Sequence, residues 1–481
     1  MFNESLNEMN KIYAFIATLS CMMPCLAANA QSYVPKDGEI GFSLFQTTKD
    51  KPFRSVLSTP FTPHRYSDVG FLDLDSASDS HPFWGIGISI TDASCWLLSQ
   101  MSAEDRHAFL ERVFGRDGMN LGIIRLNCGS SDYATELYNY NDHSGDVSMR
   151  HFSIERDRKY MIPIIKEIQQ IRPDVFIFSS IWSAPGWMKT SGQMCGGSLK
   201  DEYLQAFANY WAAYLKAYKE EGVVIDAMTV QNEPLTDQAG GCPATLVSAE
   251  QEARLVGKLL PAAFRKAGLG TKIWLLDHNF LFWERVIDEL SDEDVLRNVA
   301  AVAWHPYEGS PSVQEKVHER FPGMEMHLTE HGPAVGDHGR TAKWWSEEIC
   351  ACLNYGCSSY TGWNLLLDTD GQPVTGKFNC AGLYSIDTDT GTVLPSSQLT
   401  VFSHIAPFVK PGAVILRASH PDKELPSMAF RNPDGSIVVF IASDNLHRRK
   451  KFQIKYRGNF LSVALPMETW SLTTVVIRDR S

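Results

Sequence analysis

The stretch Val230-Gln231-Asn232-Glu233-Pro234 follows the run Val224-Ile225-Asp226-Ala227-Met228-Thr229, in which most residues are apolar or β-prone. Such a run predicts a buried parallel strand, and the polar pair before a proline predicts that the strand ends in a loop at Asn232 and Glu233. In a (β/α)8 barrel, the loops after the C-terminal ends of the strands carry the chemistry. A carboxylic acid at this position indicates a barrel enzyme, and the alternative is a surface carboxylate at a strand end.

A second glutamate has the same setting. The run Met324-Glu325-Met326-His327-Leu328-Thr329 leads directly into Glu330, which His331-Gly332-Pro333 follows. Glycoside hydrolysis by double displacement needs one carboxylic acid to protonate the leaving oxygen and one carboxylate to attack the anomeric carbon. Two glutamates at two strand ends meet this need, provided that both strands belong to one barrel.

Length and composition narrow the classes of protein. A chain of 481 residues can form one large barrel and a smaller domain, and 44% hydrophobic with 21% charged residues is ordinary for a globular protein. The net charge of −12 argues against a nucleic-acid partner. No spacing among the cysteines and histidines matches a zinc site, so neither a metal nor a cofactor is predicted.

The N-terminal residues 1–30 have the features of a signal peptide with a short upstream extension. The segment Ile12–Ala28 is mainly apolar, and Ala28-Asn29-Ala30 has the small-x-small pattern of a cleavage site. We therefore expect export to the periplasm, cell surface or medium after cleavage near Ala30. Lipidation at Cys21 or Cys25 stays open. The apolar run is marginal for a membrane span, so no stable membrane insertion is expected.

Strand-like and helical segments alternate from residue 80 to residue 409. Eight segments predict strands: Trp84–Ile90, Leu121–Asn127, Val175–Ile181, Val224–Thr229, Ile273–Asp277, Val302–His305, Met324–Thr329 and Tyr360–Leu365. Eight others have helical spacing: Ala103–Phe114, Glu155–Ile171, Leu199–Glu221, Ala249–Ala267, Phe282–Asn298, Ser312–Arg320, Thr341–Tyr355 and Ser396–Phe408. Such alternation implies parallel strands joined by right-handed crossovers, and eight units close a (β/α)8 TIM barrel.

Short β runs without helices between them occupy residues 410–481, which predicts a small antiparallel β-sandwich domain. The N-terminal segment 31–75 contains the strand-like run Ile40–Thr48, and we expect this strand to complete that domain. The acidic segment Leu72–Asp79 is interpreted as a solvated turn, because it lacks the spacing of a calcium loop.

With these motifs in place, the chain resembles glycoside hydrolase family 30, which includes glucosylceramidases and β-1,6-glucanases. The motifs stand in order: Thr91-Asp92-Ala93 after the first strand, Arg125 with Asp132 seven residues later, Ser183-Ala184-Pro185-Gly186-Trp187-Met188-Lys189-Thr190, Asn232-Glu233-Pro234, His305-Pro306-Tyr307, Thr329-Glu330 and Trp363-Asn364-Leu365. Each motif alone is weak, but the ordered set at the correct strand ends is specific.

The resemblance implies a retaining β-glycosidase with Glu233 as acid/base and Glu330 as nucleophile. Their carboxyl groups would lie about 5–5.5 Å apart, the spacing that allows a covalent glycosyl-enzyme. Asn232 would hold the sugar 2-hydroxyl. Arg125 would keep the nucleophile ionised by Coulomb attraction, and Tyr307 would orient it with a hydrogen bond.

The resemblance also implies a pocket for the terminal sugar, lined by Asp132, Trp182, Trp363 and Asn379. His305 is expected beside the acid/base, and a histidine that only completes the barrel wall is the alternative. A pocket that is closed beyond the non-reducing end of one sugar predicts exo-type action on a terminal β-glucosyl unit.

Three departures from the family pattern leave the substrate open. The family usually has a small residue or cysteine after the nucleophile, where this chain has His331. The middle residue of the H-x-Y motif is Pro306, and the loop after Trp363 is interpreted as short. A β-1,6-glucan or a glucosyl lipid is expected, with β-xylanase, β-galactanase or β-fucosidase activity as alternatives. A catalytically inactive carbohydrate-binding barrel is the alternative from another class. Exo or endo action, the oligomeric state and disulfide pairing stay open.

Overall fold

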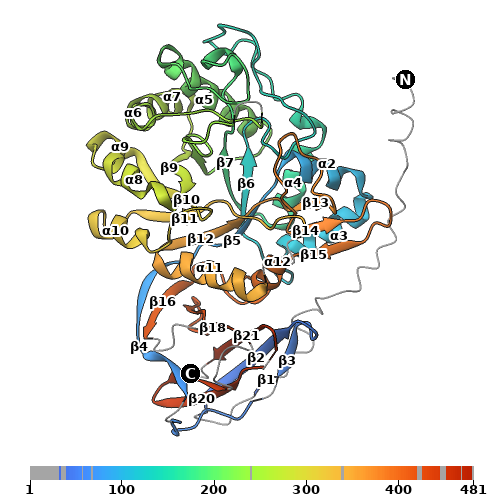
Figure 1. The fold of residues 1–481 in the computed structure, drawn as a ribbon, viewed down its shortest axis with the longest axis vertical. Coiled ribbons are helices and arrows are strands. Elements are labelled where there is room, and N and C mark those ends of the chain that lie inside the picture. Colours follow the sequence, from blue (N-terminus) through green and yellow to red (C-terminus); the bar gives the residue numbers. More distant parts are fainter. Residues whose placement is uncertain are drawn as a thin grey trace.

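The computed structural model describes residues 32–33, 39–56, 58–66, 69–238, 241–336, 341–419, 425–444, 451–466 and 468–478. The predicted signal segment, residues 1–30, lies outside the described residues. Figure 1 shows two parts, a barrel of strands and helices above and a curled sheet below.

Eight parallel strands form a closed barrel, which confirms the predicted (β/α)8 fold. The strands are β5 (Gly85–Ser89), β6 (Ile123–Asn127), β7 (Phe176–Ser180), β8 (Ala227–Thr229), β9 (Lys272–Asn279), β10 (Val299–His305), β11 (Glu325–Leu328) and β12 (Cys357–Gly362). Hydrogen bonds join them in chain order, and β12 pairs with β5 to close the ring. Their C-terminal ends therefore share one rim.

The barrel helices follow the predicted alternation, but they include a helix that was not predicted, Asp92–Gln100, and two of the predicted helices are divided. The observed helices are α2 (Asp92–Gln100), α3 (Ala103–Phe114), α4 (Met161–Ile171), α5 (Leu204–Glu220), α6 (Ala249–Arg254), α7 (Leu260–Ala267), α8 (Trp283–Leu290), α9 (Glu293–Asn298), α10 (Val313–Arg320), α11 (Ala342–Tyr355) and α12 (Ser397–Phe402). A π-helical turn, Leu255–Leu259, separates α6 from α7. The predicted helix Phe282–Asn298 is broken because the side chain of Asp292 accepts the N–H groups of Asp294 and Val295 and starts α9.

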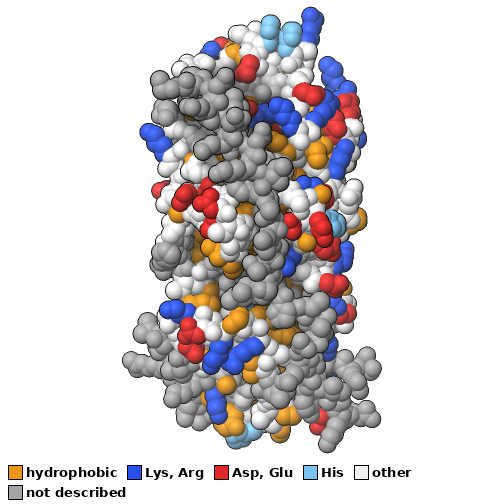
Figure 2. All heavy atoms as spheres, turned by 90° about the vertical axis from the view of Figure 1, so that its right-hand side faces the viewer, with side chains coloured by type: hydrophobic (Ala, Val, Ile, Leu, Met, Phe, Trp, Pro, Cys, Tyr) orange, Lys and Arg blue, Asp and Glu red, His pale blue; other side chains and the backbone are white. Residues whose placement is uncertain are grey.

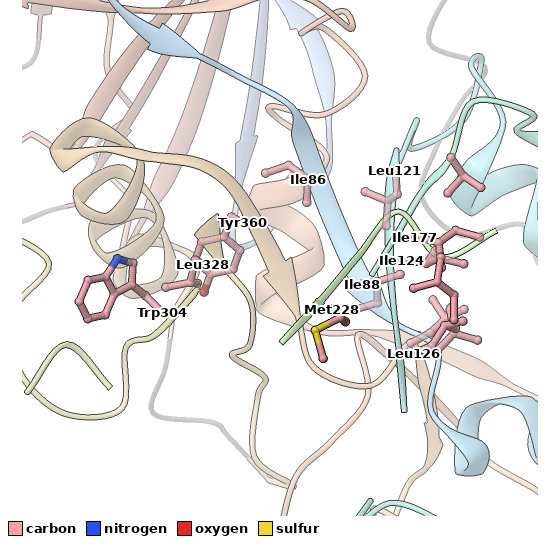
Figure 3. Packing of buried hydrophobic residues seen from close by; sticks show 14 of the residues in the cluster. Ile86, Ile88, Leu121, Ile124, Leu126, Ile177, Met228, Trp304, Leu328 and Tyr360 are labelled. Atoms are coloured by element: carbon pink, nitrogen blue, oxygen red, sulfur yellow. The ribbon is translucent and has the colours of Figure 1, made fainter. Parts of the chain in front are cut away.

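Side chains alternate between the inside and the outside of the barrel strands. Inside, a separate cluster contains Ile123, Phe178, Ala227, Trp274, Ala301 and Ala303. Their chain neighbours, such as Ile124, Ile177 and Met228, belong to the large cluster under the helices (Figure 3). Strands buried on both faces explain why the sequence has continuous apolar runs here. All eight cysteines of the described chain are free thiols: Cys95, Cys128, Cys195, Cys242, Cys350, Cys352, Cys357 and Cys380.

The second part is one curled, mainly antiparallel sheet built from both ends of the chain. Its strands are β1 (Ser32–Tyr33), β2 (Gly41–Thr48), β3 (Arg54–Val56), β4 (Gly70–Pro82), β16 (Val414–Ser419), β17 (Ser427–Arg431), β18 (Ile437–Ser443), β19 (Lys451–Tyr456), β20 (Asn459–Ala464) and β21 (Ser471–Arg478). β2 pairs with β21 along its whole length, which confirms that an N-terminal strand joins the C-terminal strands.

The interpretation of Leu72–Asp79 as a solvated turn was wrong. These residues lie in β4, which pairs antiparallel with β16 and parallel with β19. Leu72 and Leu74 are buried, whereas Asp73 accepts a hydrogen bond from Lys455 Nζ at 3.1 Å. The alternation of leucine and aspartate is thus the period-two pattern of a half-buried strand, with the acids on its outer face.

The segment after Trp363 is longer than expected and has structure of its own. It contains a small sheet of β13 (Leu366–Asp368), β14 (Tyr384–Ile386) and β15 (Val393–Pro395) before α12 begins. The connection between β13 and β14 reaches the barrel mouth, where Thr375 donates to the backbone oxygen of Asp132.

The curled sheet shares the hydrophobic core of the barrel. In β18, Val438, Phe440 and Ala442 belong to the barrel cluster, whereas Val439 and Ile441 belong to a second cluster on the other face of the sheet. Helix α11 lies between barrel and sheet (Figure 1). One face of the sheet therefore completes the barrel core.

The surface in Figure 2 has acidic and basic side chains interspersed, with small groups of apolar side chains between them. Such scattered apolar side chains are ordinary for a folded protein. Within the described residues, no helix combines the length and the apolar character needed to cross a membrane.

We predict that Phe440→Ala lowers the free energy of unfolding by about 3–5 kcal/mol, because it removes a fully buried ring at the interface of sheet and barrel. Urea unfolding followed by circular dichroism measures the loss. Leu394→Ala is the control, since Leu394 in β15 is 49% exposed and its truncation should cost no more than about 0.5 kcal/mol. Equal losses in the two variants would contradict the shared core.

Candidate active site

The two glutamates lie at strand ends on the same rim of the barrel. Glu233 follows β8, and Glu330 follows β11, the fourth and seventh strands of the ring. Between them, His305 ends β10, with its Nδ1 at 3.1 Å from Glu233 Oε1 and 4.0 Å from Glu330 Oε1. Both carboxyl groups therefore face one ring nitrogen, an arrangement compatible with the roughly 5–5.5 Å spacing of retaining glycosidases.

Each oxygen of the Glu330 carboxyl accepts a different donor. Arg125 Nη1 donates to Oε2, and the Tyr307 hydroxyl donates to Oε1 at 2.8 Å. Glu330 is only 6% exposed. The two donors fix the orientation of the carboxylate, and its charge is balanced by the guanidinium.

Asp277, near the end of β9, lies at the centre of the hydrogen-bond network of the site, and no role was predicted for it from the sequence. Its two oxygens accept hydrogen bonds from five side chains: Arg125 at 2.8 Å, Ser180 at 2.8 Å, Thr229 at 2.7 Å, Thr329 at 2.6 Å and His305 at 3.0 Å. Burial alone would raise the pKa of Asp277, but the charge of Arg125 and the bond from His305 hold that pKa far below its ordinary value. A polar residue after a buried strand was the only signal in the sequence.

His305 links the acid network to Glu233. Its Nε2 donates to Asp277 and its Nδ1 lies against Glu233. Burial lowers the pKa of His305, but the negative charge of Glu330 and the bonds to Asp277 and Glu233 outweigh it and raise this pKa to about 9. For Glu233, burial opposes ionisation, yet the hydrogen bond and charge of His305 lower its pKa. Both shifts favour an ion pair between Glu233 and His305.

Arg125 also orients Asn232. Its Nη2 donates to Asn232 Oδ1 at 2.8 Å, and the Arg125 guanidinium lies 4.8 Å from the ring centre of Trp182. With Oδ1 engaged, the amide nitrogen Nδ2 of Asn232 is left to donate. Asn232 therefore presents a donor beside the two carboxyl groups.

The backbone is strained where β8 and β9 end. Glu233 has φ +48°, and Leu276 and Asp277 have φ +73° and +59°. The left-handed region is costly for residues other than glycine, most of all for leucine. The Glu233 N–H donates to the Asp277 carbonyl at 3.0 Å, so the two strained turns support each other.

Trp182, Trp363 and Asp132 form one wall of the site. The indole rings of Trp182 and Trp363 stack with centres 5.1 Å apart. Asp132 is 6% exposed, and its Oδ1 has no hydrogen-bond partner among the described residues. Burial and the nearby charge of Glu330 raise the pKa of Asp132 well above its ordinary value. Trp182 and Trp363 are 5% and 2% exposed, so only small parts of the two rings are accessible, and the unpartnered oxygen of Asp132 offers a polar contact.

Asn379 differs from the other predicted site residues. It is exposed on the connection between β13 and β14, and its backbone oxygen accepts the Val335 N–H at 2.9 Å. That bond joins this connection to the segment after Glu330. The structure brings together the remaining predicted residues, but it shows no contact of the Asn379 side chain with them in the described part of the chain.

A parallel barrel with two glutamates facing each other at its C-terminal rim has the paired carboxyl groups that glycoside hydrolases use. Residues 83–385 match the family described as the glycosyl hydrolase family 30 TIM-barrel domain. The chain belongs to this family, whose members are retaining enzymes.

Two kinds of relatives are similar to the chain. The endo-1,6-β-D-glucanase of Neurospora crassa is 32% identical over 381 residues, which cover 74% of this chain and 78% of that protein. Putative glucosylceramidase 1 of Caenorhabditis elegans is 28% identical, covering 76% of this chain and 75% of that protein. The solved structure of an endo-β-1,6-glucanase is 26% identical with a TM-score of 0.81, covering 92% of this chain and 100% of that one.

We predict that Asp277→Asn destabilises the protein by about 3–5 kcal/mol, because it leaves the Arg125 guanidinium buried without this partner. The pKa of His305, about 9 in the wild type, should fall, as measured by NMR of the imidazole nitrogens. Because the pKa of His305 is higher in the folded protein than the value near 6.5 of an unfolded chain, protonation of His305 stabilises the fold. This stabilisation is complete at pH values below about 6.5 and is lost as the pH rises through about 9. The stability difference between wild type and variant should therefore shrink over that pH range.

Asp226→Asn is the matched control. Asp226 precedes β8 at the opposite end of the barrel, where it accepts the Ile177 N–H at 2.9 Å. An asparagine oxygen can still accept this bond, so a loss below about 1 kcal/mol is expected. A His305 pKa that stays near 9 in Asp277→Asn would rule out the network described here.

Proposed function

We propose that the protein is an exported, retaining β-glycosidase that cleaves β-linked glucosides, with Glu330 as nucleophile and Glu233 as acid/base. The observation that carries the proposal is the position of both carboxyl groups at one nitrogen of His305, with Glu330 held by Arg125 and Tyr307.

In the first step, a Glu330 oxygen attacks the anomeric carbon while the bond to the leaving oxygen breaks. Glu233 transfers its proton to that oxygen, which leaves as an alcohol, and the sugar stays bound as an ester of Glu330. In the second step, Glu233 takes a proton from water, and the water oxygen displaces Glu330 from the anomeric carbon. The configuration at that carbon is thus retained.

The ion pair of Glu233 and His305 holds the proton that the first step needs. The Glu233 side chain is 17% exposed, so a bound sugar would displace the water that solvates its charge. Desolvation favours the neutral acid, and transfer of the Nδ1 proton of His305 to Glu233 provides it. Asp277 then holds the neutral imidazole through Nε2.

Asn232 is suited to bind the sugar 2-hydroxyl. Its Oδ1 accepts from Arg125, so its Nδ2 can donate to the hydroxyl oxygen. Such a contact strengthens as positive charge develops on the sugar ring.

A β-1,6-glucan is the preferred substrate of this proposal. The relatives that are 32% and 26% identical bear the names of endo-β-1,6-glucanases. The accessible edges of Trp182 and Trp363 offer apolar contacts for a glucose ring, and Asp132 Oδ1 can accept from its hydroxyl groups.

A glucosyl lipid is the second candidate. The putative glucosylceramidase of Caenorhabditis elegans is 28% identical. On the side of Glu233, Leu235 and Leu281 are 40% and 54% exposed, and these apolar side chains follow β8 and β9 at the barrel mouth. Apolar groups beside the leaving-group side favour a lipid aglycone.

Export is part of the proposal because Ala28-Asn29-Ala30 follows an apolar segment. Mass spectrometry of the protein from its native host would measure the N-terminus, and a mature chain that begins near Gln31 is expected. Retention of residues 12–28 in that protein would contradict export by this signal.

We predict opposite behaviour for two variants at the glutamates. Glu330→Gln should lower hydrolysis of 4-nitrophenyl β-glucoside by several orders of magnitude, because it removes the charge of the nucleophile. Glu233→Ala should form the glycosyl-enzyme with this activated substrate and then stall, and added azide should release a β-glucosyl azide. An α-azide would indicate inversion.

Glu325→Gln is the matched control, since Glu325 begins β11 at the other end of the same strand. It should keep near wild-type activity. More than a few per cent of activity in Glu330→Gln would exclude Glu330 as the nucleophile.

We predict exo-type action, because the terminal-sugar wall is closed behind Asp132. Thr375 donates to the Asp132 backbone oxygen from its N–H at 2.7 Å and its hydroxyl at 3.0 Å, which seals this side with the connection after β13. Product analysis over time on a β-1,6-glucan should give glucose first. Asp132→Ala should lower kcat/KM by the factor that corresponds to a loss of about 2–4 kcal/mol of transition-state binding. A ladder of long oligosaccharides at early times would establish endo action, as the names of the glucanase relatives imply.

A further inference from the structure

We propose that Glu233, His278 and His305 form a binding site for a divalent transition-metal ion, and that an ion bound there inhibits the enzyme. These residues come from the ends of β8, β9 and β10, three neighbours in the barrel. One ligand atom from each lies within 4.8 Å of the other two.

The distances suit a small ion. His305 Nδ1 and His278 Nδ1 lie 3.1 Å and 3.8 Å from Glu233 Oε1. Ligands of a tetrahedral zinc ion, at about 2.0–2.1 Å from the metal, are roughly 3.3–3.5 Å apart. All three ligand atoms lie within 4.8 Å of one another, so rotations of the side chains that shorten the longer separations would bring them to bonding distance of one ion.

His278 supplies an independent observation. It is 3% exposed, and its Nδ1 has no hydrogen-bond partner among the described residues. The other nitrogen, Nε2, lies 3.2 Å from Thr236 Oγ1, and the ring packs on Phe282. The ring is thus fixed with an unused nitrogen directed at Glu233, and such a buried polar atom requires an explanation.

The surroundings complete a metal-site arrangement. Asp277 accepts from His305 Nε2, which is the carboxylate–histidine pair that orients metal-binding histidines in proteins. The site contains three carboxylates, from Glu233, Asp277 and Glu330, and one guanidinium, from Arg125. The negative charges exceed the permanent positive charge, which favours binding of a cation. Two histidines and one glutamate form a known zinc ligand set that leaves one position open for water. Binding exchanges the Nδ1 proton of His305 for the metal ion.

The consequence for catalysis follows from the ligand atoms. An ion on Glu233 Oε1 occupies the carboxyl group that, in the proposed function, moves the proton in both steps. Only this inhibition rests on the proposed function, because the binding itself needs no substrate.

The test uses the full-length, metal-free protein. Titration with Co²⁺ should produce the visible absorption of a tetrahedral site at one ion per chain, and calorimetry with Zn²⁺ should give the same stoichiometry. His278→Ala and His278→Phe should each weaken Zn²⁺ binding at least tenfold. The phenylalanine variant preserves the ring volume beside Phe282, which guards against loss of folding.

His143→Ala combined with His151→Ala is the matched control. These exposed histidines stack with ring centres 4.1 Å apart and offer an alternative surface site for metal. The double variant should bind Zn²⁺ like the wild type. Unchanged binding in His278→Phe, or no binding to the wild type at 1 mM Zn²⁺, would overturn the proposal.

Inhibition is measured separately with 4-nitrophenyl β-glucoside. Zn²⁺ should lower the rate of the wild type, EDTA should restore it, and the residual rate of His278→Phe should be at least tenfold less sensitive. Metal binding without hydrolysis by the metal-free protein would refute the proposed function and leave the metal site standing. Hydrolysis that saturating Zn²⁺ leaves unchanged would refute the inhibition.

Discussion

The buried ion pair of Arg125 and Asp277 is the interaction on which the geometry of the site depends. Both side chains are fully buried, so each charge would be costly without the other. Both residues make several further hydrogen bonds: Arg125 also donates to Ser180, Glu330 and Asn232, and Asp277 accepts from five side chains. The network thereby connects the ends of β6, β7, β8, β9, β10 and β11 into one unit.

That network gives chemically identical groups different properties. Glu330 accepts from a permanent cation and a phenol, whereas Glu233 lies against the imidazole of His305, which can lose its proton, and near that of His278. A carboxylate whose orientation is fixed by two donors is suited to attack a carbon, and a carboxyl group beside a titratable base is suited to exchange a proton. The assignment of the two roles thus follows from the neighbours of each glutamate.

The sequence predicted the fold and the two glutamates because each rests on a local pattern. Continuous apolar runs predict barrel strands, and a carboxylate directly after such a run predicts a rim position. Asp277 has the same local pattern, but its function depends on donors from five other places in the chain, which no spacing reveals. The proposed metal site could not be predicted for the same reason, since Glu233, His278 and His305 are distant in sequence and meet only when β8, β9 and β10 pair. In β4, by contrast, the alternation of leucine and aspartate was present and was misinterpreted.

The curled sheet is attached to the barrel at the N-terminal ends of β5 and β12, opposite the rim that carries the site. The barrel closes between β12 and β5, and β5 follows β4 of the sheet after only Phe83 and Trp84. The Phe83 N–H donates to the Ala413 oxygen at 2.9 Å, directly before β16, and the Phe83 ring lies 4.9 Å from that of Phe430 in β17. The Trp84 N–H donates to the Ser358 oxygen of β12 at 2.7 Å. The sheet is therefore anchored where β12 and β5 close the barrel, and the closure of the barrel depends on strands from both ends of the chain.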